Sequence, residues 1–107
     1  MKGFNGGMAQ LMKQANQMQL KMKKTQEEIC KHEFTGTSGG SACTVVVTGD
    51  SKMVSVKFNS DVLKSGDAEM IEDMIVSATN DALKTAKDTM AKEMEKITGG
   101  MGIPGMF

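Results

Sequence analysis

Apolar side chains recur every three or four residues along the first third of the chain. They begin near Met8 and continue to Ile29, with alternating spacings typical of a heptad-like helix. Seven positions form this apolar stripe: Met8, Leu11, Ala15, Met18, Met22, Thr25 and Ile29. Because an α-helix turns by about 100° per residue, the same helix places lysines on the line opposite the stripe. The pattern predicts one long helix with an apolar face and a basic face.

After this helix the pattern changes and predicts strands. A first strand could open at Phe34, before a small polar loop over residues 36–41. Residues 42–48 are rich in β-branched side chains, and residues 53–58 alternate between two sides. One side of this last strand is expected to carry Val54, Val56 and Phe58. The turn-forming residues between these two strands predict an antiparallel hairpin, so we expect a meander of two or three strands.

A second long helix is predicted after a run of helix-breaking and capping residues that ends at Asp67. Glu69 and Glu72 lie in its first turns, where a helix N-terminus favours negative charge. Helical spacing is kept by Ile71, Met74, Ile75, Ala78, Ala82, Ala86, Met90, Met94 and Ile97. Gly99 and Gly100 are expected to end the helix.

The length of 107 residues favours a single domain, and the composition favours a small, adaptable core with four Phe, twelve Met and no Trp or Tyr. Two long helices beside a small sheet leave apolar surface that a symmetric second copy would bury. We therefore predict an α+β fold that forms a homodimer. Its predicted parts are a flexible leader over residues 1–7, one domain over 8–98 and a flexible tail over 99–107. The expected core or dimer contacts are Met18, Met22, Ile29, Val45, Val47, Val56, Ile71 and Ile75.

Lysines dominate one end of the chain, although its formal net charge is zero. Residues 1–31 carry a net charge of +4 and residues 67–107 a net charge of −4. The candidate DNA-binding residues are Lys13, Lys24 and Lys31, opposite the apolar stripe, with Lys21 and Lys23 flanking them. A merely solvated helix face is the alternative interpretation. The chain has no Arg, which removes bidentate reading of guanine edges and disfavours sequence-specific base reading.

Two glycine-rich segments match phosphate-binding motifs only in part. Gly100, Gly102 and Gly105 fit a GxGxxG string, but a helix rather than a strand precedes them and Pro104 lies inside the string. The loop over residues 35–41 leads into a strand and lacks the Lys-Ser or Lys-Thr pair of a P-loop. We expect a tail and a strand connector, and no nucleotide cofactor.

Cys30 and His32 are the candidates for metal or nucleophilic chemistry. With Glu28 or Glu33 they still offer too few ligands for a closed zinc site. His32 is the only histidine, and no partner that would orient it is identifiable. We expect no metal, no cofactor and no enzymatic activity.

The expected location is the cytoplasm, without a membrane partner. Cys30 and Cys43 form neither a CxxC motif nor a disulfide framework, which suits a reducing compartment. The first residues lack an apolar signal core, and the aliphatic run Val45–Val47 is far shorter than a membrane span.

Several short segments follow one another in a characteristic order over nearly the whole chain. They are Leu11-Met12-Lys13-Gln14-Ala15 with Gln17-Met18-Gln19, Thr35-Gly36 with Ser38-Gly39-Gly40, Glu69-Met70-Ile71-Glu72-Asp73-Met74-Ile75, Asn80-Asp81-Ala82 and Ile97-Thr98-Gly99-Gly100. Each is unspecific alone, but their order, spacing and total length resemble the YbaB/EbfC family of bacterial nucleoid-associated proteins. The sequence departs from the family pattern in lacking Arg and in placing Ser41-Ala42-Cys43-Thr44 where Gly and a larger apolar residue are more usual.

The resemblance implies an α-β-β-β-α subunit, a tweezer-like homodimer with projecting helices, and binding to double-stranded DNA in or near the nucleoid. In such a dimer the lysine face of the first helix would bind phosphates and affect DNA organisation or gene expression. The alternative is an interaction module whose apolar stripes recruit a replication or recombination protein, with DNA contact incidental. A small enzyme or metal protein built on Cys30 and His32 is the third possibility.

Overall fold

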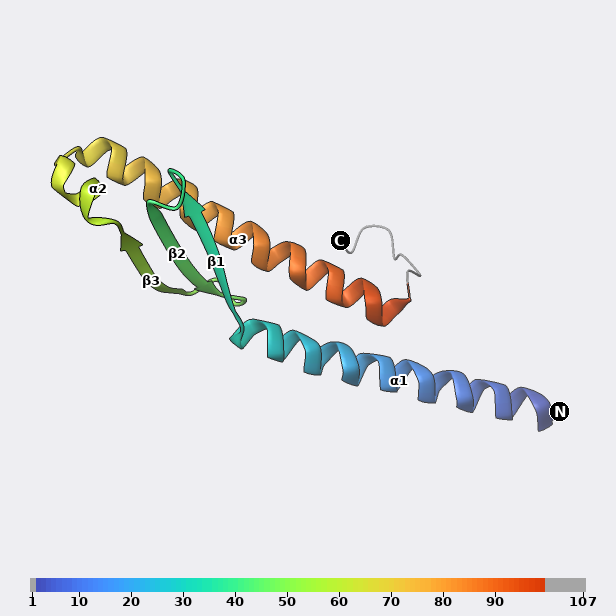
Figure 1. The fold of residues 1–107 in the computed structure, drawn as a ribbon. Coiled ribbons are helices and arrows are strands. Elements are labelled where there is room, and N and C mark those ends of the chain that lie inside the picture. The colour runs from blue at the N-terminus through green and yellow to red at the C-terminus, as the bar shows by residue number, and fades with distance from the viewer. Residues whose placement is uncertain (1, 100–107) are drawn as a thin grey trace.

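The computed structural model of the chain describes residues 2–99, with side chains from residue 7 onward. Its elements, in order, are α1 (Lys2–Lys31), β1 (Glu33–Ser38), β2 (Cys43–Thr48), β3 (Met53–Phe58), α2 (Ser60–Ser65) and α3 (Ala68–Thr98). The strands form one antiparallel sheet in the order β1-β2-β3 (Figure 1). The predicted α+β fold with its helix–three strands–helix order is confirmed, and the short helix α2 is an addition to it.

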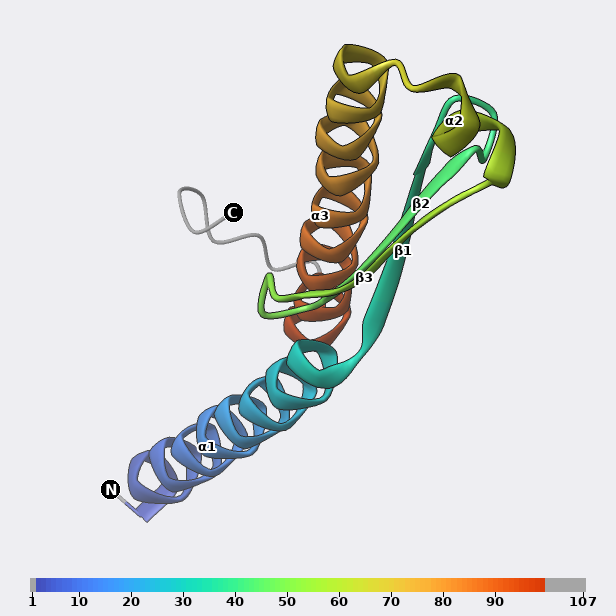
Figure 2. The ribbon, with the colours of Figure 1, turned by 90° about the vertical axis from the view of Figure 1, so that its left-hand side faces the viewer.

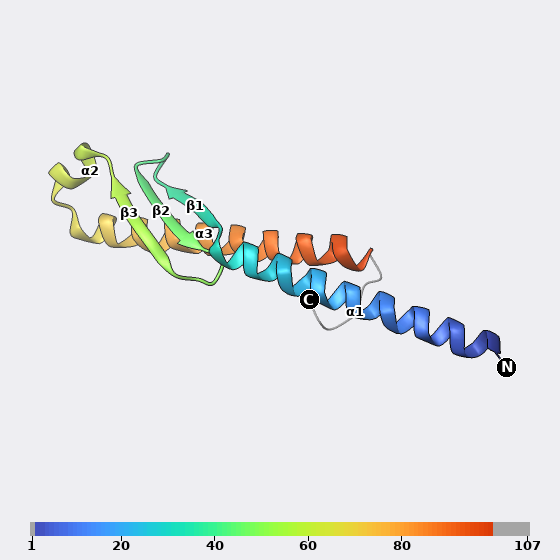
Figure 3. The same cartoon turned by 90° about the horizontal axis from the view of Figure 1, so that it is seen from below.

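The molecule is elongated because α1 continues far beyond the sheet. Its principal extents are 77 × 23 × 15 Å, and its radius of gyration is 20.7 Å, against about 13 Å for a compact domain of this length. Seen from below, the sheet lies over the N-terminal half of α3, and the C-terminal half of α3 runs beside α1 (Figure 3). Residues 7–17 of α1 are all exposed, and Met18 is the first half-buried residue. We call residues 7–17 the α1 arm.

The core lies between α3 and strands β1 and β2. α3 contributes small side chains, which allow the helix to approach the sheet closely. The buried cluster consists of Ile29, Phe34, Cys43, Val45, Val47, Ala78, Ala82 and Ala86. Phe58, Met74, Leu83 and Met90 pack against its margin. The core is therefore thin, with one helix covering one face of the sheet (Figure 2).

Gly36 lies in β1, although it was predicted to open a polar loop. A Cβ atom at this position would meet the backbone of α3 at the carbonyl oxygen of Ala78 and the amide nitrogen of Ala82. The prediction of a loop over residues 36–41 was therefore wrong for residues 36–38. The reason is tertiary: glycine is needed where two backbones approach closely, and local sequence does not show that contact.

β3 departs from the predicted alternation at its first residues. The register shifts so that Val46 pairs with Ser55 and Val47 pairs with Met53, which leaves Val54 in a bulge. Val54 is 51% exposed and Val56 is 38% exposed. Both remain accessible because β3 is an edge strand, while α3 lies mainly across β1 and β2.

The second long helix has the predicted ends. Asp67 caps α3 by accepting a hydrogen bond from the backbone nitrogen of Met70 at 3.1 Å. Gly99 takes the left-handed conformation at the C-cap, with φ 66°. The tail and the GxGxxG string lie at residues 100–107, outside the described residues, except that Gly99 belongs to this cap.

The first helix begins earlier than predicted. α1 starts at Lys2 rather than near Met8, so the predicted leader over residues 1–7 is helical from Lys2 onward. Three glycines in this stretch weaken its intrinsic helix propensity. Extension of a helix that has already formed costs far less than nucleation, and this explains why the glycines do not end it.

Candidate nucleic-acid interface

The five candidate DNA-binding lysines all belong to α1. Lys13, Lys21, Lys23, Lys24 and Lys31 are all exposed. Within the part of the chain that the structure describes, the ion pairs are Lys52 with Asp50 and Lys96 with Glu93, so none of the five is paired. The first acidic residue of the chain is Glu27, beyond the α1 arm. The arm therefore presents positive charge without a compensating carboxylate.

Helix geometry arranges the lysines as predicted. Lys13, Lys24 and Lys31 fall within about 20° of one line along α1, and Lys21 and Lys23 lie roughly 70° and 90° away on its two sides. We call these five side chains the lysine face. The apolar stripe on the opposite side is buried at Ile29 and half-buried at Met22, and it is exposed on the arm. One face packs while the other is available to a partner.

An acidic side chain that the sequence did not predict lies beside the lysine face near the C-terminal end of α1. Lys23 and Lys31 line a groove of about 480 Å³ together with Gln26, Glu27, Cys30 and Asp50. Asp50 arrives from the β2–β3 turn, which is tied to the end of α1 because Gly49 donates its backbone N–H to the carbonyl oxygen of His32 at 3.0 Å. That tether spans distant parts of the chain, so no local pattern could reveal it.

The carboxylate of Asp50 is held in its charged form. The hydroxyl of Thr48 donates a hydrogen bond to it and lowers the pKa of Asp50, desolvation opposes this shift, and the ammonium of Lys52 at 3.7 Å lowers the pKa further. A phosphate near Lys23 and Lys31 would therefore meet a nearby negative charge. The arm around Lys13 has no such charge, and it is the more favourable part for an anion.

Glutamines accompany Lys13 on the arm. A groove of about 500 Å³ is lined by Ala9, Gln10, Lys13, Gln14 and Gln17. The charge pattern of this helix does not single out these amides. Their spacing of four and three residues, which places them on one face, is the signal that could have found them.

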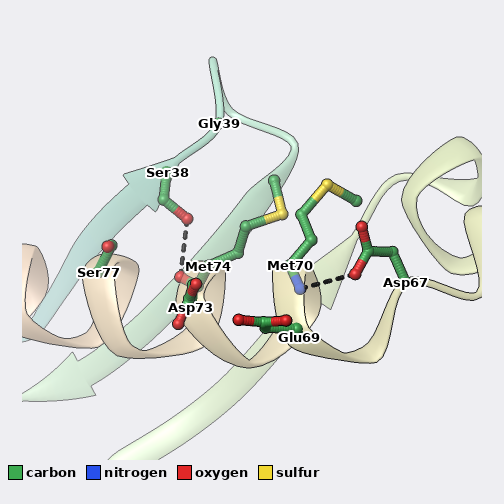
Figure 4. A pocket seen from close by; sticks show the side chains of 8 residues that line it. All are labelled: Ser38, Gly39, Asp67, Glu69, Met70, Asp73, Met74 and Ser77. Atoms are coloured by element: carbon green, nitrogen blue, oxygen red, sulfur yellow. Dashed lines mark hydrogen bonds between the residues drawn. The ribbon is translucent and has the colours of Figure 1, made fainter.

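The surface at the other end of the molecule is acidic. A groove of about 410 Å³ lies between the β1–β2 turn and the start of α3, and Asp67, Glu69 and Asp73 contribute carboxylates to it (Figure 4). Ser38 closes one side by donating its hydroxyl to the carbonyl oxygen of Met74 at 2.7 Å. Three carboxylates make this groove unfavourable for a phosphate.

The candidates for metal or nucleophilic chemistry, Cys30 and His32, lie in the last turn of α1 and directly after it. Cys30 is half-buried and Cys43 is buried in the core. His32 packs edge-on against Phe34, with 5.0 Å between the ring centroids. Within residues 2–99, no three side chains of His, Cys, Asp or Glu are grouped so that they could hold a metal ion. The described helices also contain no segment that is long and apolar enough to cross a membrane.

The predicted core or dimer contacts fall into two groups. Ile29, Val45 and Val47 are buried within the chain. Met18, Met22, Ile71 and Ile75 are half-buried, and Val56 is exposed. The second group retains apolar surface that a further partner could cover.

Comparison with known proteins places these features in a family context. The sequence model of the YbaB/EbfC DNA-binding family matches residues 4–101. A protein of Clostridium kluyveri named nucleoid-associated protein is 49% identical over 105 residues, which cover 98% of this chain and 92% of that protein. A nucleoid-associated protein of Clostridium novyi is 46% identical, with 98% of this chain and 94% of that protein covered.

A solved structure shares the fold. An uncharacterized protein of Helicobacter pylori superposes with a TM-score of 0.68 at 22% sequence identity. The match covers 85% of this chain and 96% of that protein. The observed arrangement of helices and strands therefore recurs in a protein with limited sequence similarity.

Proposed function

Since the chain belongs to the YbaB/EbfC DNA-binding family, we propose that it binds double-stranded DNA as a homodimer, mainly through the lysine face of α1. The observation that carries this proposal is the lysine face of α1, five exposed and unpaired lysines on a helix that projects beyond the sheet (Figure 1). The relatives of this chain are named nucleoid-associated proteins and not enzymes, in agreement with the prediction from the sequence. We place the protein in the nucleoid, where it would affect DNA organisation or gene expression.

Phosphates are the part of DNA that this face suits best. Lysine ammonium groups act as mobile point charges that neutralise phosphates wherever the backbone passes. Each neutralised phosphate releases condensed counterions, and this release drives the association. The binding energy therefore comes mainly from the DNA backbone.

Exposed apolar side chains support a homodimer. Val54 and Val56 on the sheet edge, Val76 on α3 at 59% exposure and the arm stripe around Leu11 remain uncovered in a single chain. A symmetric second copy would bury such surface on both subunits at once. A two-fold axis would also present two lysine faces, so that the paired arms can straddle a duplex.

Binding of a labelled duplex, followed by fluorescence anisotropy over a salt series, tests this function. With four to six phosphates neutralised per dimer, we expect log affinity to fall against log salt with a slope of roughly −4 to −5. Sedimentation equilibrium of the same sample should give twice the chain mass of 11.5 kDa.

Two results would contradict the proposal. Absence of duplex binding at low salt would remove DNA as the partner and favour recruitment of a replication or recombination protein through the apolar stripe. A mass of one chain at the binding concentration would remove the homodimer.

A further inference from the structure

The α1 arm carries amides suited to base edges beside Lys13, whose ammonium group suits a phosphate. We propose that Gln10, Gln14 and Gln17 enter the major groove and contact adenine edges, so that the protein prefers duplexes containing A·T pairs. This inference rests on the proposed DNA-binding function and adds a specificity to it.

The three glutamines share one face of the α1 arm, which no other part of the described chain covers. At about 100° per residue they fall within roughly 60° of one another, and Lys13 lies directly beside them. All three are exposed, and together with Lys13 they line the same groove. Toward the sheet, Lys21 and Lys24 continue this row. A duplex that meets the lysine face therefore meets the amides too.

The dimensions of the arm fit the major groove. An α-helix with its side chains is about 10–12 Å wide, and the major groove of B-DNA is about 12 Å wide. The arm spans residues 7–17, about 16 Å at the usual rise per residue, or three turns. Gln10, Gln14 and Gln17 sample all three turns; Gln17 lies nearest the line of Lys13, Lys24 and Lys31, and Gln14 lies nearest the edge of the apolar stripe.

The chemistry of the amide matches adenine. A glutamine side chain carries a carbonyl acceptor and an NH₂ donor, which pair with the N6 amino group and the N7 atom of adenine. The prediction against base reading rested on the lack of Arg, which removes the guanidinium contacts to guanine edges but leaves the contact of a glutamine amide with adenine in the major groove intact. The amides also avoid the repulsion that glutamates at these positions would exert on phosphates.

The absence of acids from the arm argues against a merely solvated face. Exposed helices commonly pair Glu with Lys four residues apart for stability. Here the acidic residues of α1 begin at Glu27, and the positions near Lys13 hold uncharged amides instead. This composition gives up ion-pair stabilisation and retains hydrogen-bonding capacity toward a polyanion.

Anisotropy with two duplexes of equal length, one with a central A·T block and one entirely G·C, tests the inference. We expect the wild-type dimer to bind the A·T duplex at least fivefold more tightly at the same salt concentration, since one good bidentate pair discriminates roughly 5- to 150-fold. Gln17→Ala, which removes the amide nearest the lysine face, should remove most of this preference without changing the salt slope. Gln19→Ala, on the opposite side of the same helix, is the matched control and should keep the preference. Circular dichroism verifies that both variants remain helical.

A third duplex carrying 7-deaza-adenine in the A·T block removes the N7 acceptor and largely preserves groove shape. Loss of the preference on this duplex supports contact in the major groove, whereas an undiminished preference would assign it to DNA shape and overturn the inference. Equal binding of the A·T and G·C duplexes with a steep salt slope would overturn base reading and leave the proposed function standing. Failure to bind either duplex at low salt would overturn both.

Discussion

Replacing Lys13, Lys24 and Lys31 together with Ala is expected to weaken duplex binding about 300-fold at roughly 0.1 M salt. The three side chains form the central line of the lysine face, and all are exposed and unpaired. Their removal should reduce the salt slope from about −4.5 to about −2, because fewer counterions are released per dimer. At roughly 0.1 M salt, where log salt is about −1, the slope difference of about 2.5 corresponds to the expected loss of about 300-fold in affinity. Fluorescence anisotropy with a labelled duplex measures both quantities.

A control variant separates local charge from total charge. Lys84→Ala, Lys87→Ala and Lys92→Ala together remove the same three charges from the exposed surface of α3. Acidic residues are interleaved with these lysines, so they form no uniform basic face. We expect this variant to lose less than about fivefold in affinity, as befits a weak long-range effect. Equal losses in the two triple variants would show that overall charge, rather than the lysine face, determines binding.

Gly36→Ala is expected to destabilise the fold by about 3 kcal/mol or more, at the upper end of overpacking costs. The added Cβ would collide with the backbone of α3 at Ala78 and Ala82, and neither backbone atom can rotate away. α3 must then move from the sheet and open the thin core. In a domain of this size the expected fall in melting temperature is about 12 °C or more, measured by thermal unfolding in circular dichroism.

Gly7→Ala is the matched control for this substitution. A Cβ at Gly7 meets no atom within 4 Å, and the position lies inside α1. Alanine favours a helix over glycine by roughly 0.5–1 kcal/mol, so the melting temperature should be unchanged or slightly raised. If Gly36→Ala melts within about 2 °C of the wild type, β1 and α3 are not in the close contact described.

Local sequence signals predicted the elements whose ends depend on local chemistry. The cap at Asp67 and the glycine at position 99 define α3 through bonds between near neighbours. The turn between β2 and β3 likewise joins the two predicted strands. Such signals act within a few residues, and for that reason a single sequence shows them.

The errors arose where distant segments decide the structure. The local sequence around Gly36 predicts a loop, but its close contact with the backbone of α3 places it in a strand. The alternation around Val54 predicts a regular strand, but the register shift between Val46 and Val47 places it in a bulge. The carboxylate of Asp50 reaches the lysine face through a turn bonded to the end of α1. These contacts join residues far apart in the chain, and periodicity carries no information about them.

The sequence predicted the lysines of the candidate interface but not its glutamines. The positions of the five lysines follow from helix geometry alone. Whether they are free depends on neighbouring acids from other elements, which the structure describes. The helical spacing of the three arm glutamines can be found in the sequence. That they are exposed on a part of α1 that packs against nothing in the described chain is shown only by the structure.

Lysine acetylation footprinting, followed by mass spectrometry with and without duplex DNA, tests most directly where the DNA lies. We expect bound duplex to slow acetylation of Lys13, Lys24 and Lys31 several-fold, because neutralised ammonium groups are shielded by phosphate. Lys84, Lys87 and Lys92 should react at unchanged rates. Protection of the α3 lysines with unchanged rates on α1 would contradict the assignment of the DNA-binding face to α1.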